Sequence, residues 1–173
     1  MFQDLQIIHY PDPRLRKTSE PVTTFDDRLK ALAARMFELM RGNKGVGLAA
    51  PQVGENIRLF IANPSGEPAD DRIYVNPMLS EPDAGEEEGD EGCLSLPEIN
   101  GKIMRTKSMR IDAQDLEGNP FNDTQTGYLA RIWQHEFDHL NGTMIIDRMG
   151  ALAKMGAKKQ LKVLEEIYAK RKR

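Results

Sequence analysis

The spacing of apolar residues changes along the chain, and these changes predict the order of helices and strands. Apolar residues recur at the spacing of one helix face in three segments, residues 24–40, 126–141 and 152–170. Residues 57–62 and 72–75 are short apolar runs typical of strands, and residues 103–116 alternate as a strand or hairpin does. Helices near both ends with strands between them predict an α+β fold, in which antiparallel strands pack around the middle helix.

Residues that cap or stop helices support these boundaries. Asp26 or Thr24 is placed to cap the first helix, and Gly42 and Gly45 are placed to end it. Gly142 follows the middle helix and is expected to stop it. Residues 45–52 (GVGLAAPQ) are small and apolar, and they predict a loop that lets backbone and ligand approach each other.

Length and composition predict one globular domain over residues 1–173, with 39% hydrophobic and 29% charged residues. A net charge of −3 does not indicate bulk attraction to nucleic acid, and we expect no specific DNA binding. No apolar stretch reaches the roughly 20 residues that span a bilayer, and the N-terminus lacks the pattern of a signal peptide. We therefore expect a cytoplasmic protein without a membrane partner.

Charge is unevenly distributed. Residues 81–91 are strongly acidic, and the segment from Lys154 to Arg173 is basic. Both patterns are typical of solvated surface, and the acidic run is assigned no function. The chain has one cysteine, Cys93, so an internal disulfide is impossible and a reducing compartment is indicated.

The sequence His135-Glu136-Phe137-Asp138-His139 is an HExxH motif within the middle predicted helix. Side chains four residues apart lie on one helix face, about 5–6 Å from each other, so both imidazoles can reach one metal ion. Glu136 follows the first histidine, where its carboxylate can exchange a proton with water at that ion. The motif therefore predicts a metal-dependent hydrolase.

Two histidines do not complete such a site, because a catalytic ion needs three protein ligands and one open position. Cys93 is a candidate, since a thiolate binds Zn²⁺ or Fe²⁺ strongly. Asp147 and the carboxylates of residues 81–91 are further candidates, and spacing alone does not choose between them. A buried cysteine with no ligand role also fits the sequence.

Three segments together resemble the signature motifs of the peptide deformylases. Residues 45–52 are similar to GxGLAAxQ, residues 91–95 to EGCLS, and residues 134–142 to QHExxHLxG, in the same order along the chain. The resemblance implies a hydrolase that removes the formyl group from the N-terminal methionine of nascent polypeptides and releases formate. It also implies that Cys93, His135 and His139 bind the metal, with Fe²⁺ in the cell and Zn²⁺, Ni²⁺ or Co²⁺ as alternatives.

The resemblance further assigns catalytic and substrate-binding residues. It implies that Glu136 moves the protons, and that the Gln52 amide and the Leu94 N–H stabilise the oxyanion. The methionine side chain and the extended peptide are expected to bind at four residues, Val46, Gly47, Tyr128 and Ile132.

Two expectations concern the surroundings of the site and the partners of the protein. Asp138 is placed to pair with Arg105 and so to support the metal ligands. The basic C-terminal helix is placed to dock near ribosomal RNA, where the substrate emerges. The resemblance favours a bacterial cytosol as the setting and leaves an organelle open.

Three other classes of protein remain as alternatives. The first is an HExxH zinc metallopeptidase that cuts internal peptide bonds, although only acidic residues follow the motif as a third ligand. The second is a structural metal site, which would need four protein ligands. The third is a cysteine hydrolase with Cys93 as nucleophile and His135 as base.

Overall fold

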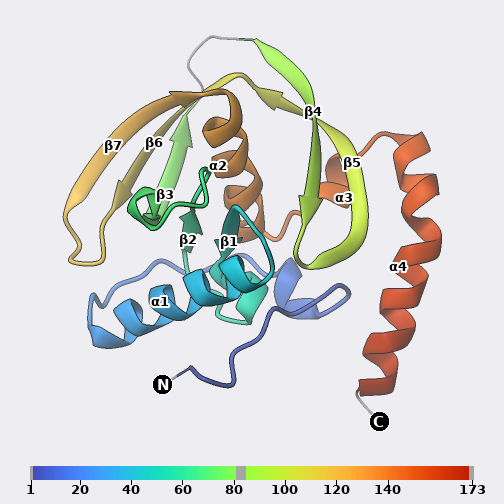
Figure 1. The fold of residues 1–173 in the computed structure, drawn as a ribbon, viewed down its shortest axis with the longest axis horizontal. Helices are drawn as coiled ribbons and strands as arrows, with labels where there is room; N and C mark the ends of the chain where they lie inside the picture. The colour runs from blue at the N-terminus through green and yellow to red at the C-terminus, as the bar shows by residue number, and fades with distance from the viewer. Residues whose placement is uncertain (1, 81–84, 172–173) are drawn as a thin grey trace.

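The computed structural model describes residues 2–80 and 85–171. In these residues one α-helix precedes the strands and the other α-helices follow them (Figure 1). The helices are α1 (Asp27–Gly42), α2 (Gly127–Leu140), α3 (Ile145–Arg148) and α4 (Ala151–Arg171). The strands are β1 (Gly47–Ala49), β2 (Leu59–Ala62), β3 (Arg72–Ser80), β4 (Glu86–Cys93), β5 (Leu96–Thr106), β6 (Ser108–Gln114) and β7 (Pro120–Thr126). Short 3-10 turns occur at Pro13–Arg16, Ala50–Val53 and Pro68–Asp70.

The strands form two antiparallel sheets, which confirms the predicted α+β fold. One sheet has five strands in the order β1-β2-β3-β6-β7, and the other is the β4–β5 hairpin. Helix α2 lies between them (Figure 1), and its Trp133 and Ile132 are buried in a core cluster with residues of β2 and β6. Helix α4 packs on β5 through Ala157 and Leu164. Among the described helices, none is both long enough and apolar enough to cross a membrane.

The predicted caps occur where the helices begin and end. The Asp26 side chain accepts a hydrogen bond from the Leu29 N–H at 3.0 Å and caps α1, so Asp26 rather than Thr24 has this role. Gly142 follows α2 with a φ of +71°. Its N–H bonds the His139 carbonyl at 3.2 Å, and this left-handed turn ends the helix that carries the HExxH motif.

The sequence pattern missed or misplaced several strands. Residues 45–52, expected as a loop, contain the strand β1 and the start of a 3-10 turn. Residues 103–116 are not one element, because β5 ends at Thr106 and β6 begins at Ser108. Strands β4 and β7 were not predicted, since β4 is mostly acidic and glycine-rich and β7 is mostly polar. Backbone pairing with β5 and β6, rather than an apolar face, holds these two strands.

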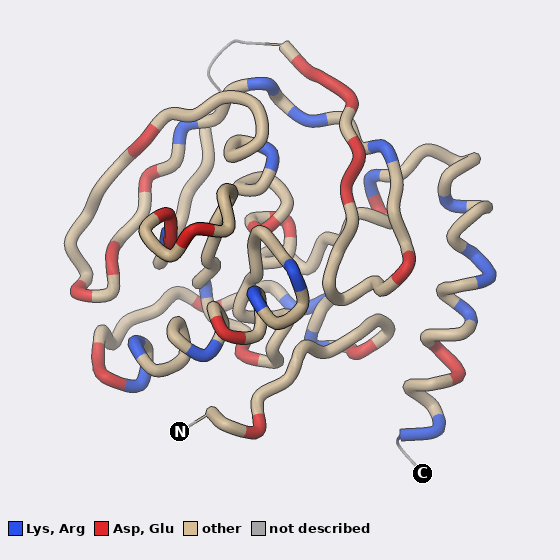
Figure 2. Tube along the Cα trace, viewed as in Figure 1, with Lys and Arg blue, Asp and Glu red and all other residues tan. Residues whose placement is uncertain are grey.

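The acidic run is only partly the solvated surface that its composition predicts. Figure 2 shows acidic residues along β4 and basic residues along α4. The carboxylates of residues 86–88 and of Asp90 are exposed. Glu91, at the end of the same run, is only 8% exposed and faces the interior. Residues 81–84 of the run, and residues 172–173 of the basic tail, lie outside the described residues.

Candidate active site

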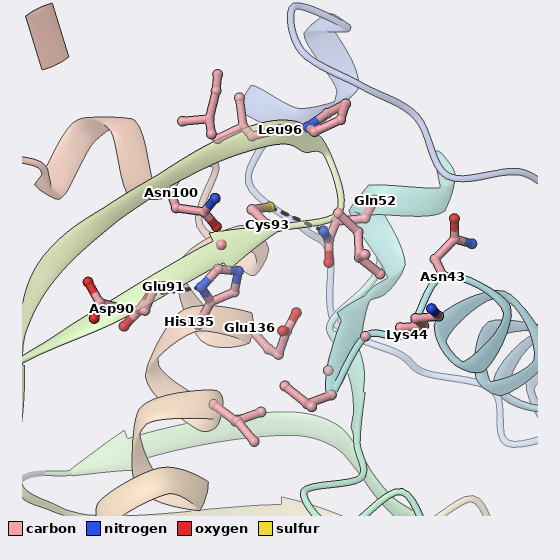
Figure 3. Close-up of a pocket in the computed structure, with 18 of the residues that line it drawn as sticks. Asn43, Lys44, Gln52, Asp90, Glu91, Cys93, Leu96, Asn100, His135 and Glu136 are labelled. Carbon is pink, nitrogen blue, oxygen red and sulfur yellow. Dashed lines mark hydrogen bonds and ion pairs between the residues drawn. The ribbon is translucent and has the colours of Figure 1, made fainter. Parts of the chain in front are cut away.

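Helix α2 brings the three polar residues of the HExxH motif to one place. His135 and His139 are one turn apart, and their Nε2 atoms are 3.3 Å from each other. Glu136 is 4% exposed, and Figure 3 shows its carboxylate beside the His135 ring. The predicted helical context of the motif is therefore present.

Strand β4 brings Cys93 to the two histidines. Its Sγ is 3.3 Å from His139 Nε2. The three candidate ligand atoms of Cys93, His135 and His139 all lie within 4.8 Å of one another. A thiolate and two imidazoles that converge in this way fit one divalent ion with an open position, so the donor set suits a catalytic metal.

Asp147, another candidate for the third ligand, lies away from the two histidines. The Asp147 carboxylate pairs with Arg16 and accepts a hydrogen bond from the Met144 N–H at 2.8 Å. It caps α3 and is not part of the group formed by Cys93 and the two histidines. Glu91, the buried carboxylate of the acidic run, instead contacts the far side of a histidine ring.

Glu91 holds the ring of His135. Its Oε2 lies 2.9 Å from His135 Nδ1, while the Arg105 guanidinium donates two hydrogen bonds of 2.9 Å to the same carboxylate. Burial alone would raise the pKa of Glu91, but the hydrogen bonds from Arg105 and His135 hold it well below its ordinary value. An ionised Glu91 places the proton of His135 on Nδ1 and leaves Nε2 free to bind a metal.

The predicted pair between Asp138 and Arg105 is confirmed, and it is buried. Arg105 Nη1 donates to Asp138 Oδ2 at 2.7 Å, and Arg148 donates two hydrogen bonds of 2.5 Å to the same carboxylate. Since Arg105 also bonds Glu91, a continuous chain of charges joins β4, β5 and α2 behind the candidate ligands.

The Glu136 carboxylate is buried. Burial raises its pKa from 4.5 to about 7. Its Oε2 is buried and has no hydrogen-bond partner among the described residues. A Cβ on Gly47 would overlap the carboxylate, which explains why the third residue of the GVGLAAPQ segment is glycine. A carboxyl group whose pKa is near neutrality suits both removal and delivery of a proton.

Gln52 is oriented by the backbone of its own turn. Its Oε1 accepts a hydrogen bond from the Ala49 N–H at 2.9 Å, so its NH₂ group must point the other way. Nε2 lies 3.5 Å from Cys93 Sγ (Figure 3). It also lies 3.2 Å from Ser95 Oγ. Leu94 is in the tight turn between β4 and β5, directly after Cys93. Both predicted oxyanion donors therefore belong to residues that border the candidate metal site.

A cavity of ≈570 Å³ opens beside these groups, within the range of small-molecule sites. The four predicted substrate-binding residues, Val46, Gly47, Tyr128 and Ile132, all line it. Ile132 is buried, whereas Tyr128 is 56% exposed at the rim. Strand β1 is at the edge of its sheet, so its free side can pair with an extended peptide.

Sequence reasoning missed other residues of the cavity wall. Arg131 lines the cavity and lies one helical turn before His135, so helical spacing alone could have found it. Glu91, His9 and Asn100 also line the cavity. Glu91 begins the EGCLS motif, but no local pattern shows that it contacts His135. His9 and Asn100 reach the site from other segments of the chain, and no local pattern points to them.

An antiparallel α+β fold with a cysteine and an HExxH helix around one cavity is the architecture of a metal-dependent hydrolase. The sequence model of the family described as polypeptide deformylase matches residues 4–155. This chain therefore belongs to the polypeptide deformylase family. The enzymes of the family are metal-dependent hydrolases that remove the formyl group from the N-terminal methionine of nascent peptides.

Individual relatives agree with this assignment. The chain is 40% identical over 166 residues to peptide deformylase 1B of Arabidopsis thaliana, a chloroplastic and mitochondrial protein, covering 95% of this chain and 61% of the plant protein. It is 44% identical over 148 residues to peptide deformylase of Rhodopirellula baltica, covering 84% and 73%. The chain thus spans less than two thirds of the length of the plant relative.

The fold is also that of solved deformylases. A crystal structure of peptide deformylase from Plasmodium falciparum superposes with a TM-score of 0.92 at 40% identity, covering 95% of this chain and 97% of the other. A plant peptide deformylase, PDF1B, superposes with a TM-score of 0.93 at 39% identity, covering 98% and 93%.

Proposed function

We propose that this chain hydrolyses the formyl amide of N-formylmethionyl nascent peptides, and that residues 1–173 act as one catalytic domain. The observation that carries this proposal is the convergence of Cys93, His135 and His139 within 4.8 Å, beside the buried carboxylate of Glu136. A structural site would need a fourth ligand, and no further His, Cys, Asp or Glu joins this group in the described part of the chain.

In this proposal Cys93, His135 and His139 hold one divalent ion. When bound, the ion supplies Lewis-acid polarisation of the formyl oxygen and lowers the pKa of water. We assign Fe²⁺ as the ion in the cell, while the same two-nitrogen, one-sulfur donor set also accepts Zn²⁺, Ni²⁺ or Co²⁺. A thiolate ligand requires a reduced cysteine, which supports a reducing compartment such as the bacterial cytosol as the setting.

Glu136 is the proton carrier of the proposed reaction. Its carboxylate takes a proton from the attacking water and then delivers it to the amine of methionine as the C–N bond breaks. Burial, which raises its pKa to about 7, supports both steps, because the group gains and loses a proton near neutral pH.

Gln52 and Leu94 complete the proposed machinery. The Gln52 NH₂ group and the Leu94 N–H donate to the oxygen that becomes negative when the formyl carbon is attacked. The methionine side chain is assigned to the apolar part of the cavity at Val46, Tyr128 and Ile132. The peptide backbone is assigned to the free edge of β1 at Gly47.

Formate release tests this proposal directly. Purified protein loaded with metal is expected to release formate from formyl-Met-Ala-Ser and to leave the Met-Ala bond intact. Acetyl-Met-Ala-Ser is the matched control substrate. Cleavage of internal bonds without formate would instead identify an HExxH metallopeptidase.

We also propose that α4 docks near ribosomal RNA. Its lysines at 158, 159 and 162 are exposed, while the opposite face packs on β5. Replacing these three lysines by glutamine in the full chain is expected to reduce co-sedimentation with ribosomes in low salt, because fewer phosphate contacts form. Lys102→Gln, on β5, is the control, and unchanged co-sedimentation of the triple variant would contradict the proposal.

A further inference from the structure

Arg131 links the first half of α2 to both strands of the hairpin that carries Cys93. Its guanidinium donates to Glu91 Oε1 at 3.0 Å, to the Ile103 carbonyl at 2.9 Å and to the Glu87 carbonyl at 2.9 Å. The residue is 9% exposed. Because the planar guanidinium donates to three acceptors on two strands, it fixes the position of β4 and β5 relative to α2.

The candidate ligands come from these two elements. His135 and His139 are on α2, while Cys93 ends β4. Among the hydrogen bonds of the described residues, α2 reaches β4 through three side chains, namely Arg131, His135 and His139. Two of these are the candidate ligands themselves. Arg131 is therefore the one of these three side chains that is not a candidate ligand. It acts beside the Asp138–Arg105–Glu91 chain, and beside the hydrogen bonds between Gln134 and the Thr106 backbone, which join α2 to the hairpin through β5.

Gly89 shows how closely the Arg131 guanidinium packs against the backbone of β4. Gly89 pairs with Ile103 in the hairpin. A Cβ on Gly89 would lie 2.7 Å from Arg131 Cζ and 2.8 Å from its Nη2. An alanine here must displace the guanidinium from its acceptors, so Gly89 and Arg131 form one contact between strand and helix.

We propose that Arg131 is a positioning residue of the metal centre, which acts through Glu91 and the β4 backbone. It holds Glu91 on His135 Nδ1, and it holds the strand so that Cys93 and the two histidines converge on one ion. It does not touch the reacting atoms. This inference rests on the proposed metal chemistry of the three candidate ligands.

Arg131→Met tests the role, because methionine keeps an unbranched stem along the cavity wall and removes the guanidinium. Glu91 retains both hydrogen bonds from Arg105, so no buried charge is left unpaired and the variant is expected to fold. We expect its Zn²⁺ affinity, measured by competition with a chelator, to fall about 10–100-fold, as for other groups that support metal ligands. With the ion saturating, kcat is expected to fall while KM for formyl-Met-Ala-Ser changes little.

Two more variants keep the proposal testable from separate directions. Gly89→Ala leaves Arg131 in the chain but pushes its guanidinium away, so it is expected to weaken Zn²⁺ binding in the same direction. Arg131→Lys keeps the charge but not the fork, and its affinity is expected to be intermediate. Arg110→Met removes a partly exposed arginine paired with Asp112 on β6, and it is the control, with Zn²⁺ affinity expected to match that of the wild type.

The outcomes separate a positioning role from a structural one. A merely structural role would lower thermal stability and leave the Zn²⁺ affinity of the folded variant within twofold of the wild type, and that result overturns the inference. If Arg131→Met does not fold, the lysine and alanine variants decide on the same measurement. A wild type that binds Zn²⁺ tightly but releases no formate contradicts the proposed function, and the effect of Arg131 on affinity is still measured.

Discussion

Replacing Glu136 by glutamine is expected to lower kcat/KM for formyl-Met-Ala-Ser by about 10²–10⁴-fold, the range that positioned acid–base groups contribute. Glutamine has almost the same shape but can neither take a proton from water nor deliver one to the leaving amine. The measurement is the rate of formate release by wild type and variant, each saturated with the same metal. Residual activity within tenfold of the wild type would contradict the assignment of Glu136 as the proton carrier.

The control for this experiment is the stability of the metal-free proteins. Burial raises the pKa of Glu136 from 4.5 to about 7. The buried protonated carboxyl group therefore leaves the free energy of unfolding unaffected below pH 4.5, and the cost of burying its charge lowers that free energy as the pH rises through 7. A raised pKa of this size corresponds to on the order of 3 kcal/mol. Urea titrations at pH 8 are therefore expected to show a more stable glutamine variant, with a smaller difference at pH 5.5. Loss of activity together with gain of stability excludes unfolding as the cause.

Removing the metal is the second change with a large expected effect. Dialysis against a strong chelator is expected to lower formate release by at least about 10²–10³-fold, because a bound ion contributes several kcal/mol of charge stabilisation. Adding Fe²⁺ without oxygen, or Ni²⁺ or Zn²⁺, is expected to restore it. The measurement is activity together with metal content before and after each step.

Two variants make the metal experiment specific. Cys93→Ser is expected to lose both metal and activity, whereas Glu136→Gln is expected to lose activity and retain the metal. If the metal-free protein instead remains fully active and Cys93→Ser is inactive, then Cys93 is a nucleophile and the cysteine hydrolase alternative is correct. Metal bound tightly in an inactive wild type would indicate a structural site.

The helix that carries the HExxH motif and the cap of α1 can both be predicted from short sequence patterns. The spacing of His135, Glu136 and His139 requires only that one segment be helical, and the apolar stripe and the stop at Gly142 predict that helix. The cap at Asp26 is equally local. Such features were predictable because a helix places residues i and i+4 together whatever the rest of the fold does.

Strand β4 was not predictable in this way. Its sequence EEEGDEGC has no apolar alternation, and its exposed carboxylates resemble solvated surface. The strand exists because its backbone pairs with β5, which lies later in the chain. The buried position of Glu91 at the end of an acidic run depends on the same pairing.

The sequence by itself determined an α+β chain with a helix that presents two imidazoles and a carboxylate on one face, because helical geometry is set by neighbouring residues. Spacing along the chain left Cys93 and Asp147 both open as the third ligand, the motif resemblance pointed to Cys93, and the tertiary structure brings Cys93 to the histidines. The tertiary structure also brings the Glu91 carboxylate to His135 Nδ1, and it lets Arg131 hydrogen-bond both β4 and β5. The physical reason is that these contacts join residues far apart in sequence, so they depend on how β4 and β5 pair and then pack against α2.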